Sequence, residues 1–253
     1  MLTTSELAMK NIAYLEANKY PGRIVFGGTM QNGHIVQGLI INVRSKPNQN
    51  RVLVEVARPN FNGQVKAEFA NPAEAAGVDP TNILYTAMSD SDRSFVTSNG
   101  QHTEVVHSMH HNLAASLIQA GWGYEHDSAN TPRIAVYTWI EPDGPVHTEF
   151  AVLKKSPFDD TIFGSNFYYR KIQPGFGFYV STYEYDDNPP PSWVGEPRLI
   201  PLIGTSLAQV TANLWDTMNR DYRVAIAAKE IAPETLQSRI HIVNAREIVT
   251  AQP

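Results

Sequence analysis

The sequence predicts an α+β layered domain rather than a doubly wound parallel sheet. Segments rich in β-branched residues follow one another along most of the 253 residues, whereas helical periodicity occurs only in a few widely spaced segments. Hydrophobic residues make up 42% of the chain and charged residues 18%, which is typical of a soluble globular protein with a sizeable core. Because no change in composition divides the chain, we expect residues 1–253 to form a single domain.

The N-terminal half begins with a predicted helix and continues as strands. Thr3 and Glu6 have the spacing of a capping box, and the apolar side chains that follow, up to Leu15, fall near one helical face. The Asn32-Gly33 pair is typical of a tight hairpin between two strands. Strands are expected at residues 23–26, 34–43, 51–56, 83–88 and 93–97.

The second half contains two further predicted helices. One is expected at residues 103–120, ending at Gly121, and the other spans the apolar residues from Leu207 to Met218, which are spaced for burial. The proline-rich stretch 186–191 is interpreted either as a stiff surface loop or as a lid over a pocket. Strands are expected at residues 133–140, 147–153, 167–172, 177–183, 222–231 and 240–243.

Composition disfavours several classes of function. A net charge of −5 and a pI of about 5.9 argue against a nucleic-acid partner. Without cysteine the chain has no disulfide, no thiolate nucleophile and no Cys-ligated zinc. The longest apolar runs, such as Gly38–Ile41, are far shorter than a membrane span, and the N-terminus lacks the pattern of a signal peptide. We therefore expect a cytoplasmic protein without a membrane partner.

The motifs of several common enzyme classes do not occur. The sequence contains no P-loop, no G-x-G-x-x-G after a strand and no G-x-S-x-G. His107, His110 and His111 have a helical spacing that can bind a metal, but no carboxylate motif such as H-E-x-x-H accompanies them. We interpret them as part of a helix surface or interface, and we predict no metal and no cofactor.

Three polar clusters lie at expected strand ends and turns, where rigidly held loops can present side chains to a ligand. Residues 44–51 carry three cations and form either a charged surface loop or an anion clamp. Residues 98–103 lead into a helix, either as a simple cap or as an anion site. Residues 124–134 combine two carboxylates, an amide and an arginine, either as a polar turn with a salt bridge or as part of a site.

These clusters belong to a longer series of short segments that occur in the order found in one family. The segments are Tyr20-Pro21-Gly22-Arg23, Arg44-Ser45 with Asn50-Arg51, Ile83-Leu84-Tyr85, Ser98-Asn99-Gly100 with His102-Thr103, Tyr124-Glu125 with Asp127, Asn130-Thr131-Pro132-Arg133-Ile134, Val180-Ser181-Thr182-Tyr183 and Gly195-Glu196-Pro197. On these residues, from about 20 to about 230, the chain resembles the archaeal-type IMP cyclohydrolase family. Thr86 departs from the family, which tends to have asparagine there, and the first helix and the tail after about Ile231 are additions.

The resemblance implies a four-layer αββα sandwich similar to the Ntn-hydrolases. It does not imply their N-terminal nucleophile, because Met1 is followed by an ordinary helix. The family reaction closes the purine ring: the carboxamide nitrogen of a formamidoimidazole carboxamide ribotide attacks its own formyl carbon, and water leaves to give IMP. The implied enzyme is therefore a hydrolase acting on a cyclic amidine C–N bond, with a purine ribonucleotide as its small-molecule partner.

The residue types suit this reaction. Because ring closure is intramolecular, much of the catalysis consists of holding the two groups in attack geometry. The amide nitrogen must lose a proton, and the formyl oxygen gains negative charge that needs donors. By resemblance, the catalytic candidates are Tyr85, Asn99, Glu125, Asp127 and Arg133, and the substrate-binding candidates are Arg23, Arg44, Arg51 and Asn130.

The roles within this set are hypotheses. Arg51, together with Arg44 or Arg23, is expected to hold the phosphate. The side chains of Arg133 and Asn99 are expected to orient the base and stabilise the oxyanion. A proton relay is assigned to Tyr85, with Glu125 or Asp127 as its partner or as the general base.

Two other classes of function stay open. A catalytically inactive or altered purine-nucleotide-binding protein would keep the arginine clamp while its proton-transfer groups drift. An Ntn-type hydrolase of another amide would need a nucleophile exposed by processing, and position 2 carries Leu2. The resemblance and the aromatic content allow a homo-oligomer without establishing one.

Overall fold

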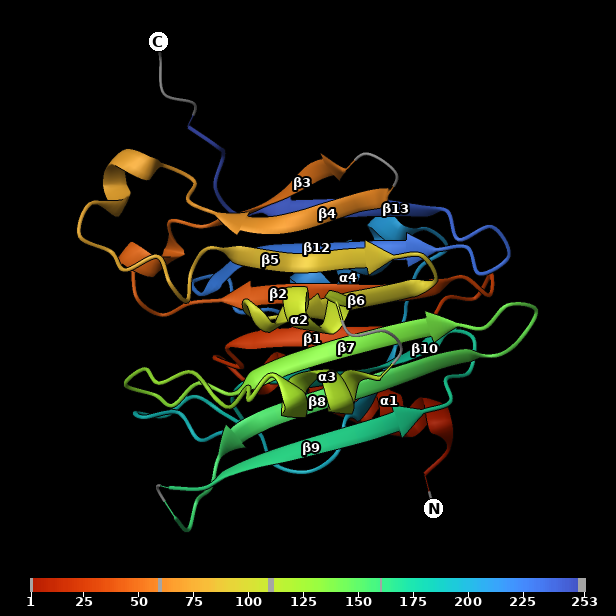
Figure 1. The fold of residues 1–253 in the computed structure, drawn as a ribbon, viewed down its shortest axis with the longest axis horizontal. Coiled ribbons are helices and arrows are strands. Elements are labelled where there is room, and N and C mark those ends of the chain that lie inside the picture. Colours follow the sequence, from red (N-terminus) through yellow and green to blue (C-terminus); the bar gives the residue numbers. More distant parts are fainter. Residues whose placement is uncertain (1, 59–60, 109–111, 160, 250–253) are drawn as a thin grey trace.

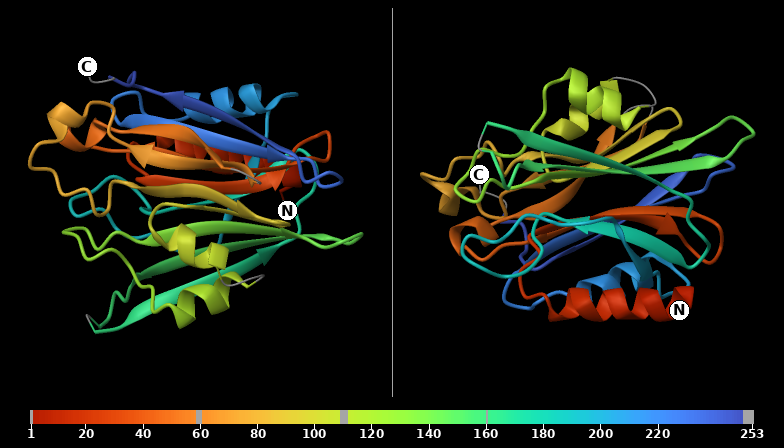
Figure 2. Two further views of the ribbon diagram at one scale, coloured as in Figure 1. Left: turned by 45° about the horizontal axis from the view of Figure 1, so that its top comes forward. Right: turned by 90° about the horizontal axis from the view of Figure 1, so that it is seen from below.

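In the computed structural model, which describes residues 2–58, 61–108, 112–159 and 161–249, two β-sheets face each other (Figure 1). Helices cover both outer faces, so that the layers follow in the order helices, sheet, sheet, helices; the right-hand view of Figure 2 shows this most clearly. Neighbouring strands pair antiparallel throughout both sheets. This arrangement agrees with the α+β layered domain that the sequence predicts.

The first sheet has six strands, with α1 (Thr4–Ala17) and α4 (Leu207–Asp216) on its outer face. A capping box fixes the start of α1, because the Thr3 side chain and the Glu6 side chain each accept from the other residue's backbone N–H. Across the sheet the order is β11 (Arg198–Pro201), β10 (Phe176–Ser181), β1 (Arg23–Thr29), β2 (Ile35–Asn42), β12 (Arg223–Ile231) and β13 (Ser238–Asn244).

The second sheet has seven strands, and α2 (His102–Ser108) and α3 (Leu113–Gln119) cover its outer face. Two short 3-10 helices lie in loops: Pro47–Gln49 in the connection from the first sheet to the second, and Pro72–Ala75 in a loop of the second sheet. Across the sheet the order is β3 (Val52–Arg58), β4 (Phe61–Glu68), β5 (Tyr85–Ser91), β6 (Ser94–Ser98), β7 (Arg133–Ile140), β8 (Val146–Lys155) and β9 (Phe163–Arg170).

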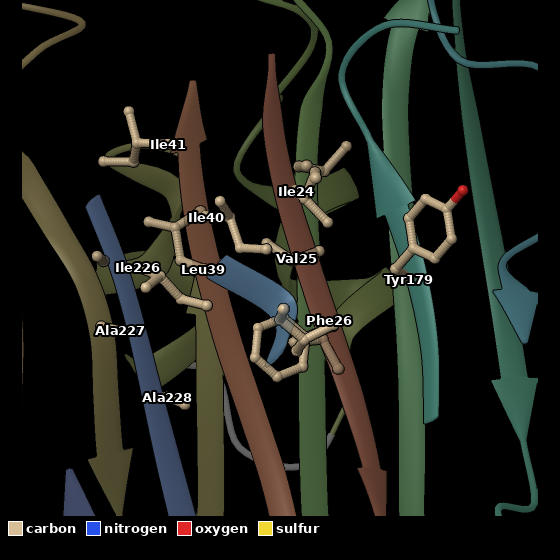
Figure 3. Packing of buried hydrophobic residues seen from close by; sticks show 14 of the residues in the cluster. Ile24, Val25, Phe26, Leu39, Ile40, Ile41, Tyr179, Ile226, Ala227 and Ala228 are labelled. Carbon is tan, nitrogen blue, oxygen red and sulfur yellow. The ribbon is translucent and has the colours of Figure 1, made fainter. Parts of the chain in front are cut away.

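The main hydrophobic core includes the apolar side chains of the central strands β1 and β2 (Figure 3). Every residue of β2 is buried, because one face meets the second sheet and the other meets helices. Phe26 lies opposite Gly38 in the β1–β2 register, and a Cβ atom at Gly38 would be 2.0 Å from the Phe26 ring. Glycine at this position therefore makes room for the aromatic ring.

The expected helix at 103–120 is wrong, because α2 and α3 are separate helices. The Asn112 side chain caps α3 by accepting a hydrogen bond from the Ala115 backbone N–H at 2.7 Å. Asparagine is favoured at such a cap over a helix interior, which explains the second start. Met109, His110 and His111 lie outside the described residues, as does the His107 side chain, so the interpretation of the histidines stays a prediction.

Most expected strands are confirmed, but the sequence analysis missed β4 and β11. In β4 only Val65 and Ala67 are fully buried among the described positions, and Gly63 interrupts the alternation. The tail expected after Ile231 adds the edge strand β13 to the first sheet. No helix in the described part of the chain is long and apolar enough to cross a membrane.

Candidate active site

Four of the predicted site residues stand where strands begin, at one end of the sandwich. Arg23, Tyr85 and Arg133 are the first residues of β1, β5 and β7, and Arg51 directly precedes β3. The strand hydrogen bonds that follow each residue fix its backbone, and the charges of Arg23, Arg51 and Glu125 act on the Tyr85 hydroxyl. The two sheets therefore contribute to one site, with Arg23 from the first sheet and the other three residues from the second.

Two adjoining cavities open here, of about 270 Å³ and about 220 Å³. Four residues, Arg23, Asn48, Arg51 and Asp127, line both of them. The first cavity is also lined by Val78, Asp79, Asn82, Ile83 and Glu125, and the second by Tyr20, Val43, Arg44, Ser45, Ser128, Ala129, Tyr183 and Pro190. Their size and shared polar wall suit a small polar ligand.

Several buried polar atoms of the site have no hydrogen-bond partner within the described residues. Arg51 and Glu125 are 2% and 1% exposed. Within the described residues no hydrogen-bond partner contacts Arg23 Nε, Arg51 Nε and Nη1, the Tyr85 hydroxyl, or either carboxylate oxygen of Glu125. Arg133 forms an ion pair with Glu125 across 3.5 Å. Because buried polar atoms in proteins are normally hydrogen-bonded, these atoms indicate a place for a ligand that can donate and accept.

Burial and charge shift the proton affinities of the two candidate proton-transfer groups. Burial raises the pKa of the Glu125 carboxyl, and the positive charges of Arg23 and Arg133 offset this only in part. Burial also raises the pKa of the Tyr85 hydroxyl, against the opposing charges of Arg23 and Arg51. Tyr85 therefore stays protonated and can donate, and Glu125 binds a proton more readily than an ordinary carboxyl.

The two phosphate-binding candidates differ in their surroundings. Burial and the neighbouring charge of Arg23 lower the pKa of Arg51 to about 10, which leaves it cationic at neutral pH. Burial also opposes the charge of Arg23, but the Glu125 carboxylate and nearby tyrosines outweigh it and raise the pKa of Arg23. Two adjacent buried cations with unsatisfied donors form a setting that an anion would stabilise.

Asn99 does not point a free group at the cavities, because both ends of its amide bind the backbone around Arg133. Its Nδ2 donates to the Pro132 carbonyl at 3.0 Å, and its Oδ1 accepts from the Ile134 N–H at 2.8 Å. The guanidinium of Arg133 lies over the Trp122 ring, 4.6 Å from its centroid. It also packs against Gly100, where a Cβ atom would be 2.6 Å from Arg133 Nη1.

Asp127 and Asn130 shape the turn between Glu125 and Arg133. Asp127 accepts from the backbone N–H of Ala129 and of Thr131, and from the Thr131 hydroxyl at 2.6 Å. Asn130 adopts a positive φ of 47°, which asparagine tolerates better than most residues. Asp127 still lines both cavities, so its charge contributes to the field of the site.

Arg44 lies at the mouth of the second cavity, where it contacts the proline-rich loop. It donates to the Asp186 carboxylate at 2.9 Å and to the Asp187 carbonyl at 2.7 Å, and it lies over the Tyr20 ring. Pro190 of the same loop is buried and lines the second cavity. The stretch 186–191 thus forms part of the cavity wall, and its role as a lid stays a prediction.

Three residues with evident roles at the site are absent from the predicted set. Asn48 lines both cavities, Trp122 supports Arg133, and His102 is fully buried beside Arg133. His102 lies in a segment that carries the family resemblance and Asn48 lies in the polar cluster 44–51, so a signal existed for both, whereas Trp122 lies in none of the predicted clusters. Within the described residues, no group of three His, Asp or Glu side chains is placed to hold a metal ion.

A two-sheet sandwich has buried arginines and a carboxylate around adjoining cavities, and the buried Tyr85 hydroxyl lies near these charges although Tyr85 does not line either cavity. Such a site suits a small anionic ligand. Comparison with known proteins is more specific. The family profile of IMP cyclohydrolase-like proteins matches residues 20–235, so the chain belongs to this family. The chain is also similar to the IMP cyclohydrolase of Methanosphaera stadtmanae, at 28% identity over 174 residues, which are 66% of this chain and 75% of that protein.

Proposed function

We propose that the chain is an IMP cyclohydrolase-type enzyme that closes the purine ring of formamidoimidazole carboxamide ribotide to give IMP and water. Membership of the family supports this proposal. The observation that carries it is the buried cluster of Arg23, Arg51, Tyr85 and Glu125, each of which has polar atoms without a hydrogen-bond partner within the described residues. A ribotide with a phosphate, an amide and a formamide offers the acceptors and donors that this cluster needs. The four layers likewise support a fold of the Ntn-hydrolase kind.

Arg23 and Arg51 hold the phosphate in this proposal. Their adjacency is unfavourable without an anion, since the charge of Arg23 helps to lower the pKa of Arg51. A phosphate between them would remove that repulsion and form charge-assisted hydrogen bonds with Nε and Nη atoms that are now unpaired within the described residues. Arg44 is occupied by Asp186 and lies nearer the surface, so it steers the ligand rather than clamping it.

The ring closes through proton transfer by Glu125 and charge stabilisation by Arg133 and Tyr85. As the amide nitrogen attacks the formyl carbon, Glu125 takes the amide proton, and negative charge forms on the formyl oxygen. Arg133 and the Tyr85 hydroxyl stabilise that charge, and Glu125 then returns the proton to the oxygen. Loss of this hydroxyl together with the remaining proton of the formamido nitrogen releases water and leaves the closed ring.

The amide of Asn99 and the carboxylate of Asp127 act mainly by positioning in this scheme. The Asn99 amide bonds on both sides of Arg133 fix the backbone from which the guanidinium extends. The Asp127 carboxylate holds the turn that carries Glu125, and Asn130 supplies the turn's left-handed residue. Geometry of this kind matters because an intramolecular reaction depends on placement within a fraction of an ångström.

The test is ring closure followed by ultraviolet absorbance, with purified protein and the formamido ribotide, with and without a chelator. Formation of IMP at a rate that Tyr85→Phe lowers by at least about tenfold supports the enzyme and the role of the hydroxyl. Absence of turnover, together with thermal stabilisation by IMP, would identify a nucleotide-binding protein or an altered substrate instead. Absence of both would refute the proposal.

A further inference from the structure

His102 is a fully buried residue at the start of α2, beside the proposed catalytic arginine. Its Nε2 atom lies 3.1 Å from the carbonyl oxygen of Ile134. A carbonyl oxygen can only accept, so Nε2 must carry the proton and donate. The other ring nitrogen, Nδ1, then presents a lone pair and can act only as an acceptor while the ring is neutral.

The neutral state of His102 is strongly favoured where it stands. Burial and the positive charge of Arg133 lower the pKa of His102 to about 3. Within the described residues Nδ1 has no hydrogen-bond partner. A Cβ atom built on Gly100 would be 3.3 Å from His102 Nδ1 and 2.6 Å from Arg133 Nη1, so both nitrogen atoms crowd around the same glycine.

Arg133 has its backbone fixed, but within the described residues its side chain has no directional hydrogen-bond partner. Asn99 binds the backbone on both sides of it, and His102 binds the Ile134 carbonyl that follows. The guanidinium itself is held by stacking on Trp122 and by an ion pair with Glu125 at 3.5 Å, which is long for a hydrogen bond. An acceptor with a fixed direction would complete its orientation.

We propose that His102 is a positioning residue for ring closure, whose Nδ1 lone pair accepts a hydrogen bond from the Arg133 guanidinium when the purine ribotide occupies the site. The inference rests on the proposed function and assigns a role to a residue outside the catalytic set given above. Because the ring is neutral, it orients the cation without repelling it and without neutralising the charge that the oxyanion needs. A protonated ring would have no lone pair at Nδ1 and would repel Arg133.

Two substitutions separate this role from a purely structural one. The side-chain carbonyl of His102→Asn lies as far from the backbone as Nδ1, so this variant keeps an acceptor for Arg133 and loses the donor to Ile134. The amide of His102→Gln reaches as far as Nε2, so it keeps the donor and loses the acceptor. His241→Gln, on β13 in the first sheet, is the control for a histidine substitution as such.

We expect His102→Gln to lower kcat by about 10²-fold with little change in KM, because the guanidinium loses its orientation. His102→Asn should retain clearly more of the wild-type kcat. Equal losses in the two variants would overturn the proposal. A smaller loss of kcat for His102→Gln would also overturn it, because that result is expected if His102 acts only through its hydrogen bond to the Ile134 carbonyl.

A spectroscopic measurement tests the inference even if the variants fail to fold. It also tests the inference if the wild type shows no turnover, a result that would count against the proposed function alone. In ¹⁵N-labelled protein, Nε2 of His102 should carry the proton, and the Nδ1 resonance should move upfield on addition of IMP. The same addition to Arg133→Met, whose side chain has no donor, should leave Nδ1 unmoved. A proton on Nδ1, or an Nδ1 resonance that IMP does not move in the wild type, would overturn the inference.

Discussion

A single methyl group added at Gly100 should test the placement of Arg133 without removing any polar atom. The Cβ atom of Gly100→Ala would lie 2.6 Å from Arg133 Nη1, 3.3 Å from His102 Nδ1 and 3.5 Å from Glu125 Oε1. Ordinary contact at a Cβ atom begins at 3.4 Å, so the guanidinium must withdraw by about 0.8 Å. It is the far end of a flexible side chain, so this movement costs little stability.

The expected result is a loss of rate without a loss of stability. A misplacement of about 1 Å in a catalytic group can lower the rate by about 10²-fold, which corresponds to about 2.7 kcal/mol of lost transition-state stabilisation. Gly100 does not adopt a left-handed conformation, so alanine is compatible with its backbone. Such a change commonly stabilises a protein by about 0.4–1 kcal/mol, because the unfolded chain loses conformational freedom.

The assay compares ring-closure rates and urea unfolding of the wild type, Gly100→Ala and Gly164→Ala. Gly164 is the matched control, because its nearest neighbour, Asn166 Nδ2, is 4.0 Å from the added Cβ and its backbone is not left-handed. The control should keep its rate. If Gly100→Ala keeps a rate within about threefold of the wild type, the precise position of Arg133 does not limit catalysis. Loss of both rate and stability would mean that a stiffer neighbour blocks the methyl group.

Three further outcomes are expected. Arg133→Ala should lower kcat by at least about 10²-fold with little change in melting temperature, and a near-normal rate would remove Arg133 from the site. Replacing Arg51 by methionine should weaken IMP binding by about 10- to 100-fold in calorimetry, as expected for a charge-assisted hydrogen bond of about 1.5–3 kcal/mol, whereas Arg44→Met should change it far less. The pKa of His102 is about 3 in the folded protein and about 6.5 in the unfolded chain, so below pH 6.5 the unfolded chain binds a proton that the folded protein does not. The contribution of this residue to stability is therefore complete above pH 6.5 and is lost as the pH falls toward 3. Between pH 7 and pH 5 the free energy of unfolding should fall by about 2 kcal/mol more in the wild type than in His102→Asn.

The sequence was sufficient to predict most strands and the polar segments, because both are local properties. Val52, Val54 and Val56 alternate, and β3 is a strand. Where a local pattern is weak the prediction failed: β4 has Gly63 near its start and the charged Lys66 between its fully buried positions Val65 and Ala67. The break between α2 and α3 depends on a cap at Asn112 inside an otherwise helical pattern, which periodicity alone does not detect.

The site was predictable as a set of residues but not as a set of roles. Arg23, Arg51, Tyr85 and Arg133 do stand at one end of the sandwich, and nothing in their chain positions indicates that the first comes from the opposite sheet. The partners of Asn99 are backbone groups more than thirty residues away, at sequence separations of 33 and 35, so its positioning geometry could not be read from the segment that contains it.

The balance of charges explains why such a site belongs at the end of a large two-sheet core. Burying Arg51 beside Arg23 is unfavourable, because burial and the charge of Arg23 lower the pKa of Arg51, and the nearby Tyr85 and Glu125 offset this only in part. The strands that start at these residues contribute apolar side chains to the main core, and the stability of that core tolerates an unfavourable polar end. Groups without partners lower the stability of the free protein and bind strongly once a ligand completes them. The same atoms therefore limit stability and favour binding, and a substitution that relieves the repulsion at Arg51 would also remove the reason for an anion to bind.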